Sequence, residues 1–168
     1  MSNHLKLPAV LIVAASSAYA VSALAANDTT TLNVFAQVNP SCTISATDLR
    51  FGKYSPNNSD ATTAETVISP SCTEGTEYEI GLDAGENGGN SDATSRAMHV
   101  NGNYLSYELY TSEARDTIWQ DIDSENTVTG TASDTPEGDT HTVYGKIPAG
   151  QFVPTGQYSD AVNVTISF

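Results

Sequence analysis

Short runs of β-branched and aromatic residues, separated by turn residues, restrict the possible folds of this chain more than any other feature. No helical repeat of apolar residues persists between the runs. Asn, Asp, Gly, Ser and Pro fill the gaps, as in residues 55–58, 85–90 and 101–103. We predict strands at residues 32–38, 42–44, 49–51, 65–69, 78–82, 104–110, 117–119, 141–147 and 161–168. Many short strands without helices predict an all-β fold, an antiparallel β-sandwich, in which 123–140 is a long solvated connection with room for one short strand.

The first 25 residues have the layout of a secretory signal peptide. His4 and Lys6 form a weakly basic start, an apolar run follows at 7–20, and 23–25 offers a small-x-small cleavage site. A transmembrane anchor is the alternative, but serine and tyrosine interrupt the run, whose fully apolar part is shorter than the ~20 residues of a span. We therefore expect an exported protein with no membrane anchor in the mature chain.

About 140 residues would remain after cleavage, which is enough for one domain with a single core. The formal net charge of the whole chain is −14, and every acidic residue follows residue 25. The basic residues of the mature chain are scattered: Arg50, Lys53, Arg96, Arg115 and Lys146. A phosphate backbone would be repelled by this charge, so nucleic acid is not an expected partner.

The two cysteines, Cys42 and Cys72, both follow the predicted signal peptide. In an oxidising compartment, a disulfide between them is the plain interpretation. Closing a loop of about 30 residues would stabilise the fold by about 3 kcal/mol. A metal site is the alternative, and it would need further Cys or His nearby. We predict a disulfide and no metal.

The last strand is the most regular, with one apolar face made of Val162, Val164, Ile166 and Phe168. Because the sequence stops there, Phe168 and its carboxylate are expected to be tucked into the domain or handed to a partner.

A second alternating segment precedes Cys42, and its apolar face consists of Leu32, Val34, Ala36 and Val38. Phe35 points to the opposite face. Alternation alone leaves two interpretations open: the segment closes its own sandwich, or it pairs with another chain.

Three stretches, 39–54, 104–115 followed by Trp119, and 144–168, resemble the spore coat protein U family, which includes the pilins of archaic chaperone-usher pili. The match covers nearly the whole mature chain in order. The resemblance implies an immunoglobulin-like, pilin-type sandwich that lacks its last strand. The missing strand leaves a groove of exposed core, and in the family a periplasmic chaperone fills this groove first. The N-terminal extension of the next subunit then replaces it at an outer-membrane usher, by donor-strand exchange.

The resemblance assigns residues 1–25 to the signal peptide, 26–40 to a donor-strand extension and 41–168 to the sandwich domain. The implied donor residues are Leu32, Val34, Ala36 and Val38, and an apolar acceptor groove is expected beside 161–168, lined by Val162, Val164, Ile166 and Phe168. Cys42 and Cys72 match the family's disulfide. The resemblance also implies that basic side chains of the chaperone bind the carboxylate of Phe168. The implied function is a structural subunit of a cell-surface pilus (fimbria) that supports adhesion or biofilm formation.

No catalytic constellation or cofactor site is expected. His99 and His141 are not accompanied by a nucleophile motif. Residues 121–125 begin like a calcium-binding loop but lack its Gly and closing Glu, which leaves only nonspecific calcium binding at an acidic surface. The alternative function is a self-contained secreted coat protein or carbohydrate-binding module, in which 32–38 completes its own fold. Four aromatic residues, Tyr104, Tyr107, Tyr110 and Trp119, could then form a sugar-binding face. Leu105, Tyr107 and Leu109 share one face of their strand, however, so part of this aromatic set is expected to be core and only the remainder could bind sugar.

Overall fold

The computed structural model describes residues 26–89, 93–122, 124–133 and 139–168, which fall into two units that meet between Ala36 and Gln37. Every regular element of the described residues is a strand, which confirms the all-β class. The strands are β1 (Cys42–Ala46), β2 (Thr62–Cys72), β3 (Glu77–Leu82), β4 (Arg96–Val100), β5 (Asn103–Tyr110), β6 (Val128–Thr131), β7 (His141–Ile147) and β8 (Val164–Ser167). Within these ranges, no helix is long and apolar enough to span a membrane.

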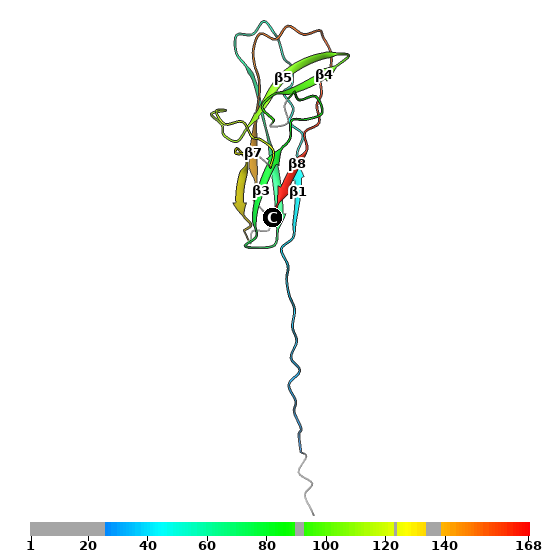
Figure 1. Cartoon of the computed structure of the whole chain (residues 1–168), viewed down its shortest axis with the longest axis vertical. Coiled ribbons are helices and arrows are strands. Elements are labelled where there is room, and N and C mark those ends of the chain that lie inside the picture. The colour runs from blue at the N-terminus through cyan, green and yellow to red at the C-terminus, as the bar shows by residue number, and fades with distance from the viewer. Residues whose placement is uncertain (1–25, 90–92, 123, 134–138) are drawn as a thin grey trace, which may run out of the picture. The chain divides into compact units, whose positions relative to one another are not determined.

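The strands form two antiparallel sheets that pack as a sandwich (Figure 1). The larger sheet has the order β1-β2-β7-β5-β4, and the smaller has the order β6-β3-β8. β2 and β7 pair along seven positions, from Thr62 opposite Ile147 to Ile68 opposite His141. β3 is the centre of the smaller sheet, where Ile80 lies opposite Ile166 of β8.

Most predicted strands lie where the alternation placed them, and 141–147 coincides with β7. Two predicted strands are wrong: 49–51 has no strand, and 117–119 makes one isolated bridge, from Ile118 to Tyr110. Residues 32–38 form no strand within this single chain, so their pairing with another chain stays a prediction. β8 is also shorter than predicted, because 161–163 is held by separate backbone and side-chain hydrogen bonds to residues 83–86 rather than by a strand ladder. β4 was not predicted, and β6 lies in the predicted long connection.

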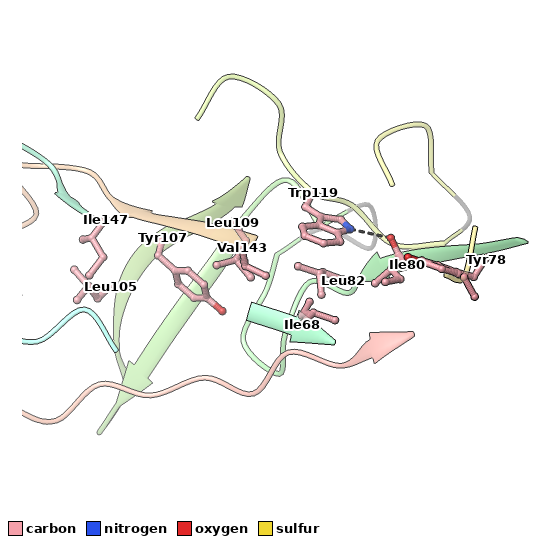
Figure 2. Close-up of a cluster of buried hydrophobic side chains, with 11 residues drawn as sticks. Ile68, Tyr78, Ile80, Leu82, Leu105, Tyr107, Leu109, Trp119, Val143 and Ile147 are labelled. Atoms are coloured by element: carbon pink, nitrogen blue, oxygen red, sulfur yellow. Dashed lines mark hydrogen bonds between the residues drawn. The ribbon is translucent and has the colours of Figure 1, made fainter. Parts of the chain in front are cut away.

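The core lies between the sheets, and its largest fully buried side chain is Trp119 (Figure 2). The indole nitrogen of Trp119 donates a 2.8 Å hydrogen bond to the carbonyl of Ile80. On β5, Leu105, Tyr107 and Leu109 are buried, as the predicted inner face required. The remaining buried apolar residues of the cluster are Ile68, Tyr78, Leu82, Ala132, Val143 and Ile147.

One long side of the sandwich is closed by the segment that carries Trp119. The amide of Trp119 donates to the carbonyl of Leu109 in the larger sheet at 2.9 Å, and the amide of Leu82 in the smaller sheet donates to Gln120 at 2.9 Å. Residues 119–120 therefore connect the two sheets through backbone hydrogen bonds. We call this the closed side.

Candidate functional site

The opposite long side of the sandwich lies between β1 and β8. β1 is the edge of the larger sheet and β8 is the edge of the smaller sheet. The two strands are neighbours (Figure 1), but no ladder joins them in the described part of the chain. Each strand thus leaves one row of backbone donors and acceptors unpaired. We call this the open side.

A groove of about 1160 Å³ runs along the open side. One wall is formed by residues 46–54, and the other by 153–162 together with Val164. The floor consists of core side chains: Ile68, Leu82, Met98, Leu105, Tyr107, Leu109, Val143 and Ile147. Apart from Met98, which is half-buried, these floor side chains are at most 6% exposed, so the groove has an apolar floor that is continuous with the hydrophobic core.

The predicted acceptor residues are distributed unequally over this groove. Val162 and Val164 are half-buried and line it. Ile166 is half-buried and packs against the core outside the groove lining, because its strand partner Ile80 fills the interior there. Phe168 is 58% exposed and also lies outside the lining. The groove thus follows residues 153–164 rather than the predicted 161–168.

Two carboxylates anchor the chain just before β8. Asp83 accepts a 2.9 Å hydrogen bond from the amide of Asn163, and it also accepts a bond from the side-chain amide of Asn163 at 2.6 Å. Asp160 accepts hydrogen bonds from the Tyr107 hydroxyl at 2.8 Å and from the Glu86 amide at 3.0 Å. Burial, followed by the bond to Asp160, raises the pKa of Tyr107, so its hydroxyl stays protonated. These side-chain bonds hold the wall together with two backbone bonds, from the Asp83 amide to the Asn163 carbonyl at 3.1 Å and from the Glu86 amide to the Ala161 carbonyl at 3.0 Å.

Arg96 supports the same region from inside the protein. Its side chain is buried, and its guanidinium donates 2.8 Å hydrogen bonds to the carbonyls of Leu82, Asp83 and Trp119. Glu108 lies 3.6 Å away. Burial lowers the pKa of Arg96, and Glu108 opposes this effect. No local sequence pattern indicates the roles of Arg96, Asp83 and Asp160, because their partners are distant along the chain.

The predicted donor extension has no regular secondary structure in this single chain. Leu32, Val34 and Val38 are 84%, 82% and 79% exposed, and Ala36 is exposed as well. Phe35, on the opposite face, is 89% exposed. Four alternating apolar side chains thus remain in solvent. The predicted signal peptide, 1–25, lies outside the described residues.

The disulfide is confirmed: Cys42 and Cys72 are bonded across a sequence separation of 30 residues. They lie directly opposite each other in the β1–β2 ladder. The bond therefore fastens β1, one edge of the open side, to its neighbour in the sheet.

The other residues considered for chemistry are mainly structural. Trp119 and Tyr107 are buried in the core and cannot present a sugar-binding face, whereas Tyr104 is 56% exposed. The Nε2 atom of His141 lies 2.9 Å from the Tyr78 hydroxyl. No group of three or more potential metal ligands occurs among the residues for which the structure gives positions.

Comparison with known proteins supports this architecture. One chain of the crystal structure of the CsuC-CsuE chaperone-tip adhesion subunit pre-assembly complex, from archaic chaperone-usher Csu pili of Acinetobacter baumannii, is similar with a TM-score of 0.55. Sequence identity is 23%, and the match covers 78% of this chain and 40% of that chain, so the likeness concerns the fold.

Sequence comparison extends over the full length. "Protein U" of Myxococcus xanthus is 31% identical over 182 residues, covering 99% of both chains. The model of the Spore Coat Protein U domain matches residues 28–165, so this chain belongs to the spore coat protein U domain family.

Proposed function

We propose that this protein is a structural subunit of a surface pilus and that its subunits join by donating a β-strand. The observation that carries the proposal is the presence of both halves of such a joint in one chain. The open side offers a groove with an apolar floor, and the edges of β1 and β8 are unpaired beside it. The extension at 32–38 offers four exposed apolar side chains with the period of a strand.

A donated strand would pair the free strand edge of one subunit and bury the exposed apolar side chains of the other. Its backbone hydrogen-bonds to the free edge of β8 or β1, and its alternate side chains enter the groove, as in other cases of β-strand addition. Each fully buried aliphatic side chain contributes about 1.5–3 kcal/mol, and Ala36 contributes less. Three larger side chains and an alanine are enough for a joint that dissociates slowly.

The proposal includes the route to the surface. Residues 1–25 direct export, a periplasmic chaperone covers the groove until assembly, and an outer-membrane usher exchanges the chaperone for the extension of the next subunit. The support for these partners is the signal-like sequence and the similarity to a chain from a chaperone-usher complex. The assembled fibre would support adhesion or biofilm formation at the cell surface.

A second candidate function is that of a secreted coat protein. The full-length similarity to "Protein U" and the name of the family favour it. In that case the chain would act as a self-contained module, and residues 32–38 would close their own sandwich. The two functions differ in whether the extension enters another molecule.

An unboiled SDS gel of periplasmic and surface fractions tests the proposal. The unaltered protein should give a ladder of SDS-resistant polymers. A Val34→Asp, Ala36→Asp double variant should give only monomer or chaperone-bound protein, because two charges would enter an apolar groove.

The matched control is an Asn33→Asp, Gln37→Glu double variant, which adds the same charge to the opposite face of the extension. It should keep the ladder. A single monomer band from the unaltered protein would instead favour the coat function.

A further inference from the structure

At one position along its length, the groove is partly filled by side chains of the protein itself. On β7 the inward positions are Val143, Gly145 and Ile147, so the middle position has no side chain. Two side chains from the 46–54 wall fill that space. A Cβ atom on Gly145 would lie 2.8 Å from Cζ of Phe51 and 3.0 Å from Cδ1 of Leu49. Phe51 therefore reaches the groove floor.

At the same level, side chains extend from one wall to the other. The ring of Phe51 meets the ring of Tyr107 in an edge-to-face contact, with centroids 6.0 Å apart. Tyr107 projects from β5 into the space between the sheets (Figure 2), and its hydroxyl bonds to Asp160 of the opposite wall at 2.8 Å. We call Phe51, Tyr107 and Asp160 the shallow level, because their contacts join the two walls across the groove floor.

The donor segment has one side chain that suits such a position. Its inward residues are Leu32, Val34, Ala36 and Val38, so a single small residue lies between larger ones. Neighbouring inward side chains of a strand are separated by about 6.6 Å, or two residues. A strand that runs the length of the groove must therefore place one of them over the shallow level.

We propose that Ala36 of one copy sits on Phe51 of the next copy, and that this size match sets the register of the donated strand. This inference rests on the proposed function. A slip by two residues would place Val34 or Val38 over Phe51, and a slip by one would turn the opposite face, which carries Asn33, Phe35 and Gln37, inward. The small size of Ala36 also makes the groove selective: an extension with a larger residue at the position of Ala36 should bind less tightly, because overpacking destabilises a close-packed contact.

Peptide binding tests the size match. The receptor is the full-length chain with Val34→Asp and Ala36→Asp, which disable its own extension, and the probe is a labelled peptide of residues 28–40. We expect Ala36→Leu in the peptide to weaken binding about tenfold or more. A receptor that also carries Phe51→Ala should bind the two peptides about equally. Phe51→Leu provides the same comparison if Phe51→Ala does not fold.

The matched control is Val34→Leu, which adds one carbon to a neighbouring inward side chain and should change affinity by less than about threefold. Equal weakening by both peptide changes, or weakening by Ala36→Leu that persists with Phe51→Ala, would overturn the size match while leaving strand donation in place. No binding of the unaltered peptide would overturn strand donation and the size match together.

Discussion

The two long sides of the sandwich are built differently. On the closed side, the backbone at Trp119 and Gln120 is hydrogen-bonded to both sheets, and Trp119 is fully buried. On the open side, β1 and β8 lie next to each other without a ladder in the described residues, and Val162 and Val164 are only half-buried.

This difference shows where the domain is complete and where it needs a further segment. The closed side uses a segment of the same chain to connect the sheets. The open side leaves two strand edges unpaired beside a groove with an apolar floor, which is a template for pairing with another chain. The stability of the single domain should therefore depend mainly on the closed side, and its assembly on the open side.

The largest expected effect is a substitution on the closed side. Trp119→Ala should lower the free energy of unfolding by about 3–5 kcal/mol, because it leaves a large cavity and removes the indole hydrogen bond to the Ile80 carbonyl. Val162→Ala, on the open side, should cost less than about 1 kcal/mol, because the side chain is only half-buried. Urea unfolding of both variants measures the contrast. Equal losses would remove the distinction between the two sides.

Removal of the disulfide is expected to have the next largest effect. A Cys42→Ser, Cys72→Ser double variant should lose about 3 kcal/mol of unfolding free energy, since the unfolded chain gains entropy. Because the bond fastens β1, the variant should also show faster amide exchange in β1 than in β3. A loss spread evenly over the sheets would argue against a specific role at the open side.

A smaller effect is expected at the carboxylate that anchors the β8 wall. Asp83→Ala removes the acceptor for both hydrogen bonds from Asn163 and should cost about 1–3 kcal/mol. Asn163→Ala removes only the side-chain bond and should cost less. Amide exchange at residues 162–166 is the direct measurement. If Asp83→Ala leaves exchange there unchanged, the anchor does not hold the wall.

The smallest effect is a pH dependence at His141. Burial lowers the pKa of His141 in the folded protein below 6.5, although Asp139 opposes the shift. The unfolded chain therefore binds more protons as the pH falls through 6.5, so stability should decrease slightly between pH 7.5 and 5.5. Thermal unfolding of His141→Gln should show a smaller decrease. An identical decrease in the variant would assign the effect to other groups.

Local sequence patterns predicted the strands well where apolar and polar side chains alternate, so that one face of the strand packs against the core. β7 and the buried face of β5 follow directly from a period of two residues. The disulfide also followed from the sequence, because the chain has only two cysteines. These features depend on residue type and local spacing, which a single sequence displays.

The shape of the groove could not be predicted in the same way. Leu49 and Phe51 alternate as a strand does, yet they pack over Gly145, which lies far along the chain. The bonds between Tyr107 and Asp160 and between Asp83 and Asn163 also join distant segments. Alternation predicts that a segment can form a strand, but not which edge it will join.

Hydrogen exchange on purified SDS-resistant polymers tests strand donation most directly. The reference is the monomer of the Val34→Asp, Ala36→Asp variant. We predict that backbone amides of residues 32–38 and 162–167 exchange much more slowly in the polymer than in the monomer, because each gains hydrogen-bond partners in the joint. Polymers in which residues 32–38 exchange as fast as a free peptide would contradict strand donation.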